Sequence, residues 1–132
     1  MTQEEKELLI KDLCARLPYS GVQIHVSYED NFKYDKTLTY EDVKNYSQLP
    51  ACSTTIVKPY LRSLSSMTKS ERKEFDDLSK FDEDVWMGNH KVGFPKQVRI
   101  MSKCVDWLNK KMFDYCGLIL KGLAIEAPEG MY

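Results

Sequence analysis

The segment KPYLRSLSSMTKSERKEF, residues 58–75, contains the residue types of an anion-binding site. A basic strand end is followed by hydroxyl side chains and by Thr68, which has the spacing of a capping box with Glu71. A helix N-terminus presents free N–H groups and a partial positive charge to any anion placed there. The candidate residues for binding an anion or a partner are Lys58, Tyr60, Arg62, Ser66, Thr68 and Lys69.

The same segment also has an ordinary structural interpretation, which we favour. Thr68 would itself cap the helix, and Glu71 would place a negative charge in its first turn. The helix N-terminus then has a partner supplied by its own chain. We therefore expect this segment to connect a strand to a helix, with anion binding as the minor alternative.

Cysteine catalysis needs a thiolate and usually a nearby histidine to generate it. The chain has four cysteines and two histidines. Cys14 and Cys104 fall on or beside apolar helix faces, where cysteine most often behaves as a small hydrophobic residue. Cys116, in DYCG, is the thiol retained as a candidate, with His25 or His90 as its base. An enzyme with a cysteine-based site is thus an alternative function, but we assign no catalytic residue.

The sequence predicts no metal site and no cofactor. Its cysteines and histidines lack the paired spacing of zinc ligands, and the acidic residues from Asp76 to Asp84 lack the order of a calcium loop. The chain contains no GxxxxGK[ST], GxGxxG or GxSxG motif, so the recognisable nucleotide and hydrolase signatures are absent from it. The acidic run is more typical of a solvated face.

Nucleic-acid binding is a further alternative, because tyrosines on strands can stack on bases while basic side chains contact phosphates. The residues that would do so are Tyr28, Tyr34, Tyr40 and Tyr60 with Lys33, Lys36, Lys58 and Arg62. A second small basic cluster contains Lys91, Lys96 and Arg99. The 19 Lys and Arg residues are balanced by 20 Asp and Glu, so the net charge provides no long-range attraction to nucleic acid.

Length and composition predict one folded domain spanning residues 1–132. A chain of 132 residues, with 42% hydrophobic and 30% charged residues, is long enough to bury a core. The N-terminus lacks the pattern of a secretion signal, and no segment approaches the roughly 20 apolar residues of a membrane span. We expect a cytoplasmic protein with free thiols and no membrane partner.

The first half of the sequence predicts a helix followed by strands. Thr2 and Glu5 form a capping box, after which Leu9, Leu13 and Leu17 recur at helical spacing until Pro18. Alternating apolar residues then predict a strand in VQIHVSYED, a second in YDKTLTYEDV, and a third in STTIVKPYLR, where the proline favours an edge position or a strand end. We expect these strands to be antiparallel.

The second half returns to helices. A helix begins after Thr68, with Phe75, Leu78 and Phe81 as its apolar face, and a loop follows around Gly88, Gly93 and Pro95. The strongest periodic stripe in the chain then contains Val98, Met101, Val105, Leu108 and Met112, with Trp107 beside it. We expect this stripe to be mainly buried within the monomer, although it is wide enough to serve self-association as well. The tail, broken by Gly117 and Gly122, predicts a short helix or strand packed on the domain.

The predicted fold class is therefore α+β. It consists of a small antiparallel sheet of about three strands, packed with an N-terminal helix and two C-terminal helices.

Three segments, KDLCARLPY, KPYLRSLSSMT and DYCGLILKGLAIEAPEGMY, resemble a group of small uncharacterised proteins encoded by phages and prophages of gut bacteria. A proline is common in that group at the position of Ser63, and an arginine at the position of Cys116, which weakens the case for a catalytic Cys116. The resemblance implies a phage-encoded protein inside the host cell. It implies no activity, cofactor or catalytic residue.

The functional expectation is a small intracellular binding or interaction accessory protein of a phage or mobile element. Its partner is expected to be another protein, with nucleic acid as the alternative. The location implied is the cytoplasm of the host cell.

Overall fold

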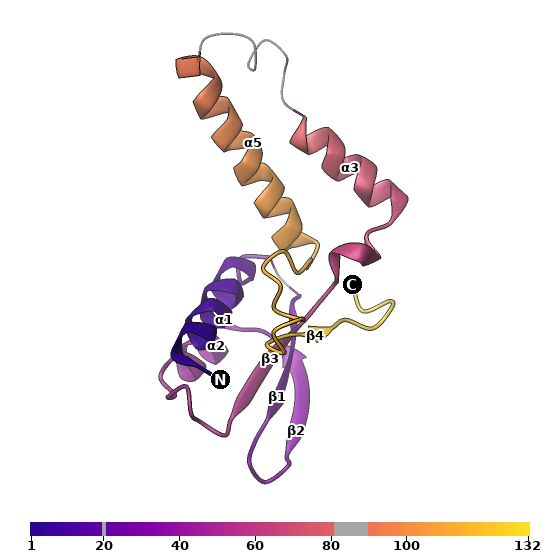
Figure 1. The fold of residues 1–132 in the computed structure, drawn as a ribbon. Coiled ribbons are helices and arrows are strands. Elements are labelled where there is room, and N and C mark those ends of the chain that lie inside the picture. Colours follow the sequence, from indigo (N-terminus) through magenta and orange to yellow (C-terminus); the bar gives the residue numbers. More distant parts are fainter. Residues whose placement is uncertain (20, 81–89) are drawn as a thin grey trace.

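The fold is α+β, as predicted, in a computed structural model that describes residues 1–19, 21–80 and 90–132, with the side chains of 90–94 not described (Figure 1). The elements are α1 (Gln3–Arg16), β1 (Gln23–Ser27), β2 (Lys33–Thr37), α2 (Tyr40–Ser47), β3 (Ile56–Leu61), the short 3-10 helix η1 (Leu64–Ser66), α3 (Lys69–Ser79), α5 (His90–Lys110) and β4 (Ile125–Glu126). No described helix combines the length and apolar character that crossing a membrane requires.

The sheet has the strand order β2-β1-β3-β4, so it has four strands rather than the expected three. The first three pair antiparallel, as predicted, whereas β4 comes from the tail and pairs parallel to β3. Pro59 lies in β3, which has a neighbour on each side. This position is tolerated because β4 pairs with Tyr60 and Leu61 and not with Pro59, so the missing N–H group falls beside the start of that pairing.

The main core lies between one face of the sheet and the helices α1 and α2. Its buried side chains come from both helices, from the strands and their flanking residues, and from the tail: Leu9, Leu13, Val22, Ile24, Val26, Leu38, Val43, Tyr46, Val57, Leu61, Met112, Leu118, Leu123 and Ala124. The opposite face, which we call the open face, presents Gln23, His25, Ser27, Lys33, Asp35, Thr37, Ile56, Lys58 and Tyr60, none of them buried. Alternation along each strand produces this division, because successive side chains point to opposite faces.

Helix α2 replaces the second half of the expected second strand. Residues 34–43 are rich in Thr and Tyr and therefore have strand propensity, but β2 ends at Thr37. Thr39 and Asp42 form a capping box that starts the helix, with Thr39 Oγ1 accepting the Asp42 N–H at 3.3 Å. Val43 and Tyr46, three residues apart, then turn into the core, which is the burial that stabilises a helix here.

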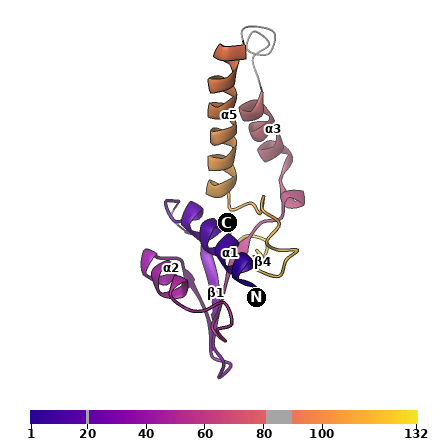
Figure 2. The same ribbon diagram turned by 60° about the vertical axis from the view of Figure 1, so that its left-hand side comes forward.

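Helices α3 and α5 run side by side away from the sheet and form a projecting pair, which we call the α3–α5 arm (Figures 1 and 2). A second, smaller core fixes the base of the arm. In it Trp107 stacks on Phe113 with ring centroids 5.7 Å apart and meets Phe75 of α3 at 5.5 Å. Leu108 is buried in the same cluster, with Leu78 packed against it.

Burial along α5 corrects the prediction for its apolar stripe. Leu108 and Met112 are buried, but Val98, Met101 and Val105 are 48%, 61% and 41% exposed. The prediction that the stripe is mainly buried within the monomer is therefore wrong for these three residues. The physical reason is that α3 covers the neighbouring side of α5, where Trp107 lies.

The expected loop before this helix is also partly wrong. Helix α5 begins at His90 and includes Gly93 and Pro95, although both residues disfavour a helix interior. Pro95 is the sixth residue of α5, so the backbone donor that it lacks is one that would otherwise bond the carbonyl of Lys91 one turn earlier. Phe81, the acidic residues Asp82, Glu83 and Asp84, and Gly88 lie outside the described residues.

Candidate functional site

The six candidate residues of segment 58–69 do not all share one site, although Arg62, Ser66 and Thr68 line one pocket. Lys58 and Tyr60 lie on the open face of the sheet, and Arg62 follows β3 directly. Ser66, at the end of η1, donates from its hydroxyl to the Ser63 carbonyl at 2.6 Å. Thr68 and Lys69 form the start of α3. The segment therefore runs from the sheet to the arm, and its side chains point to different surfaces.

Arg62 joins the arm to the sheet. Its guanidinium donates to both carboxylate oxygens of Glu71, at 2.8 and 2.6 Å, and lies 4.2 Å over the ring centroid of Phe113. The hydrogen bonds from Arg62 are the largest cause that lowers the pKa of Glu71 from 4.5 to about 2. A phosphate at Arg62 would have to displace a partly buried, bidentate carboxylate.

Thr68 caps α3, as the structural interpretation predicts. Its Oγ1 accepts the Glu71 N–H at 3.1 Å, while Glu71 Oε1 accepts the Thr68 N–H at 3.2 Å. Glu71 thus serves the cap and the ion pair with Arg62 together. Anion binding at this helix start stays a hypothesis. The Arg62 guanidinium and the backbone N–H groups of Thr68 and Glu71, which would donate to an anion, already donate to groups of the chain itself.

A pocket of about 460 Å³ lies between the start of α3 and the C-terminal tail. Its lining combines two segments far apart in the sequence: Arg62, Ser66 and Thr68 from one, and Glu126, Ala127, Pro128, Glu129, Gly130 and Tyr132 from the other. The carboxylates of Glu126 and Glu129 make this pocket a poor place for an anion. The contact between the segments is structural, since the Tyr132 hydroxyl donates to the Tyr60 carbonyl at 2.8 Å.

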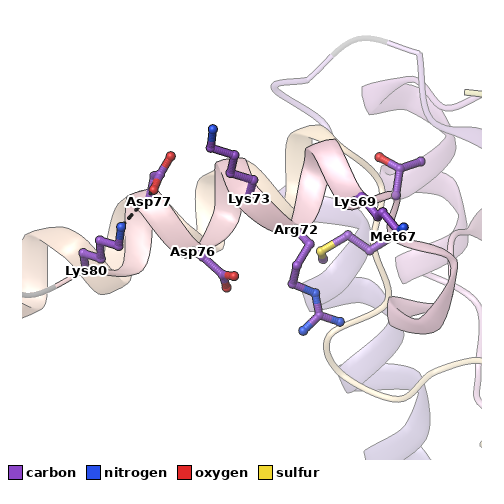
Figure 3. Close-up of a pocket in the computed structure, with 8 residues that line it drawn as sticks. Met67, Lys69, Arg72, Lys73, Asp76, Asp77 and Lys80 are labelled. Atoms are coloured by element: carbon purple, nitrogen blue, oxygen red, sulfur yellow. Dashed lines mark hydrogen bonds and ion pairs between the residues drawn. The ribbon is translucent and has the colours of Figure 1, made fainter.

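A second hollow, of about 570 Å³, follows the outer side of α3 and includes Lys69. Figure 3 shows its charged side chains spread along the helix, with Lys73 and Asp77 projecting to one side and Arg72 and Asp76 to the other. Lys80 donates to Asp77 at 3.2 Å, so part of the positive charge is already paired. Charges of both signs that diverge in this way form a solvated helix face.

Cys116 lacks the surroundings of a nucleophile. It is half-buried against the main core, and burial together with the nearby Asp12 carboxylate raises the pKa of its thiol. His25 lies on the open face, across the sheet from that core, with its Nδ1 2.7 Å from Asp35 Oδ1. No hydrogen bond joins Cys116 to a histidine within the described residues, and the His90 side chain lies outside them.

The motif around Cys116 has a structural role. Both oxygens of the buried Asp114 accept backbone N–H groups, from Leu118 and Ile119, at 2.9 Å each. Arg16 of α1 is fully buried and donates to the Phe113 carbonyl at 2.8 Å and to Asp12 at 2.8 and 3.0 Å. These bonds fix the turn DYCGLI against α1, so the motif positions the tail.

The tyrosines proposed for stacking on bases do not share one surface. Tyr28 and Tyr34 line a groove of about 310 Å³ on the helix-covered side of the sheet, and Tyr40 starts α2. Tyr60 lies on the open face, where its hydroxyl donates to Asp35 at 3.0 Å. Lys36 pairs with Asp42 at 2.8 Å. What remains for a nucleic-acid surface is Tyr60 with Lys33 and Lys58.

The sequence did not reveal two features that the fold brings together. Asp35 reaches both His25 and Tyr60 on the open face, and the hydrogen bond with His25 is the largest cause that lowers the pKa of Asp35. This cluster depends on strand register, in which Asp35 lies opposite His25. The other feature is the exposed stripe of Val98, Met101 and Val105, whose spacing was visible in the sequence but whose exposure was not.

No family model, no curated protein and no solved structure matches this chain. Function is therefore argued from the described residues. Among them, no group of three or more His, Cys, Asp or Glu side chains is placed to hold a metal ion.

Proposed function

We propose that this chain is a protein-binding accessory of a phage or mobile element, and that the α3–α5 arm is its contact element. The observation that carries the proposal is the exposed apolar stripe of Val98, Met101 and Val105 on α5. The resemblance to phage and prophage proteins supports the cellular context. The location that we propose from it is the cytoplasm of a bacterial host.

The stripe has the spacing that helix-mediated recognition uses. Val98, Met101 and Val105 follow the i, i+3, i+7 pattern by which one helix face enters a groove or packs on a second helix. Complete burial of such a side chain is worth about 1.5–3 kcal/mol, so covering the exposed part of these three would contribute roughly half that amount each. This row of exposed apolar groups on a projecting element is the binding surface that we propose.

Contacts at the base of the arm hold α5, and therefore the stripe, in a fixed position. Trp107 and Phe113 are buried between α3, α5 and the start of the tail, and the Arg62–Glu71 ion pair ties α3 to the end of β3. A partner would thus meet a preorganised helix, which lowers the entropy lost on binding.

Affinity capture from infected host cells tests the proposal, with a tagged chain as bait. Wild type should recover a stoichiometric protein, which includes an untagged copy of the chain itself. Met101→Glu should lose that protein, because a carboxylate in the stripe would have to be desolvated. Lys103→Gln, on another side of α5, lowers the net charge by the same single unit and should retain it.

Thermal unfolding of each variant first verifies that the fold is intact. Equal recovery of every bound protein by wild type and Met101→Glu would contradict the proposal. So would the absence of any specifically bound protein from the wild-type sample.

Single-stranded nucleic acid is a second candidate partner, because Lys33, Lys58 and Tyr60 share the open face with His25. Phosphate contacts weaken as salt rises, so binding of a labelled oligonucleotide should fall steeply between low and high salt. Lys33→Ala with Lys58→Ala should reduce both the affinity and its salt dependence. Binding that is insensitive to salt or to these changes would count against this candidate.

A further inference from the structure

The exposed stripe of α5 has two unequal flanks. Ile100, Cys104 and Trp107 follow one another at helical spacing on one flank, and α3 packs against it through Phe75. On the other flank, Arg99, Ser102 and Asp106 are all exposed. Beyond Asp106 this flank is covered, since Asn109 is buried and α1 contacts α5. A partner helix can therefore approach the stripe from the exposed part of the second flank, which we call the free flank, and not from the flank that α3 occupies.

The charges on the free flank have opposite signs. Arg99 and Asp106 lie two helical turns apart, so both project on the same side of α5. Neither side chain forms an ion pair with another described residue. The Asp106 carboxylate does lie near the Tyr19 hydroxyl, whose pKa is raised by burial first and by Asp106 second. One basic and one acidic group thus border the exposed stripe.

This arrangement is complementary to itself in one orientation. When two copies of α5 pack antiparallel with their free flanks together, Arg99 of each copy faces Asp106 of the other. Met101 of each copy then lies beside Val105 of the other. A parallel pair would instead bring the free flank of one copy against the flank of the other that α3 occupies.

We infer that the α5 stripe binds a second copy of this chain, through an antiparallel pair of α5 helices bordered by two Arg99–Asp106 ion pairs. The inference rests on the proposed function and names the partner. Three exposed apolar side chains per copy make an interface smaller than the roughly 800 Å² per partner of a standard stable complex. The dimer is therefore weak and depends on protein concentration.

Sedimentation or light scattering across a dilution series tests the pairing. The average mass of the wild type should rise from that of a monomer toward that of a dimer, while Met101→Glu should stay monomeric at every concentration. A wild type that stays monomeric throughout overturns the inference, and so does a dimer that Met101→Glu leaves intact.

Charge reversal tests the orientation. Arg99→Asp alone and Asp106→Arg alone should each weaken the dimer about tenfold, since two symmetric attractions become repulsions. An equimolar mixture of these two variants should form a heterodimer, and the double variant Arg99→Asp with Asp106→Arg should dimerise like the wild type. Failure of the double variant to recover, with its thermal stability unchanged, would overturn the antiparallel arrangement.

The outcome for this inference is separable from that for the proposed function. If the wild type is monomeric but Met101→Glu loses a different protein in the capture experiment, protein binding through the stripe stands and self-pairing is wrong. If the wild type is monomeric and capture recovers no protein that depends on the stripe, both are wrong.

Discussion

Helix α5 carries two apolar rows of similar length whose environments differ. One row, with Ile100, Cys104 and Trp107, faces α3 and ends in a buried tryptophan that is 7% exposed. The other row, with Val98, Met101 and Val105, stays largely exposed, with Met101 at 61%. Helical periodicity shows that a face is suited to being covered. It does not show whether the cover comes from the same chain or from another molecule.

The largest expected effect is the difference in stability between a substitution in the covered row and one in the exposed row. Trp107→Ala should destabilise the protein by about 3–5 kcal/mol, because it removes the ring that Phe75 and Phe113 pack against. Met101→Ala should change stability by less than about 0.5 kcal/mol in dilute solution, as expected for an exposed position. Urea unfolding of both variants measures this difference. Similar losses of unfolding free energy for both variants would mean that both rows are buried within the monomer.

The next largest effect concerns the Arg62–Glu71 ion pair, which ties α3, the helix that covers Trp107, to the end of β3. The folded-state pKa of Glu71 is about 2, below its ordinary value of 4.5, so its contribution is fully present above about pH 4.5 and is lost as the pH falls toward 2. That contribution is on the order of 2–3 kcal/mol. Unfolding free energies measured from pH 7 to pH 2 should show a shallower acid loss for Glu71→Gln than for wild type. Parallel curves would refute the role given to Arg62 and Glu71.

A smaller effect is expected at the N-terminus of α3. Thr68→Ala should reduce stability by about 0.5–2 kcal/mol and leave any ligand binding unchanged, because Thr68 acts as a cap. Arg62→Ala combined with Lys69→Ala tests the anion alternative, since a ligand bound to the native state raises its melting temperature. A rise with phosphate that appears in the wild type and disappears in this double variant would favour an anion site over a purely structural segment.

The smallest effect is chemical and leaves stability unchanged. Burial raises the pKa of the Cys104 thiol on the covered row, whereas Cys14 is exposed on α1. Iodoacetamide at neutral pH should therefore modify Cys14 faster than Cys104, as followed by mass spectrometry of peptides. Faster labelling of Cys104 would indicate that α3 does not cover its side of α5.

Local patterns predicted the elements that depend on neighbours in sequence. The capping boxes at Thr2 and Thr68 located the starts of two helices, and the alternation around Ile24 and Val26 located β1. Strand propensity concealed α2, because its cap uses Asp42 and its two core residues are only one turn apart. β4 has two residues and forms through pairing with β3, so no periodic pattern of its own could reveal it.

The candidate site was less predictable because it depends on contacts across the fold. Arg62 looked available in the sequence, yet the turn through η1 brings Glu71 within 2.6 Å of it. The cluster of His25, Asp35 and Tyr60 needs the register of three strands. The stripe on α5 was correctly identified as apolar and helical, and only the three-dimensional position of α3 shows which of its residues remain uncovered.

The most direct test of the account follows the methyl groups of Met101 and Met112 by NMR across a dilution series with a soluble paramagnetic agent. Met101 should broaden strongly at low concentration and become protected as the concentration rises, whereas the buried Met112 should stay protected throughout. Protection of Met101 at every dilution would show that the stripe is covered within the monomer. Exposure of Met101 at every concentration, even when the captured proteins are added, would show that the stripe is not a binding surface.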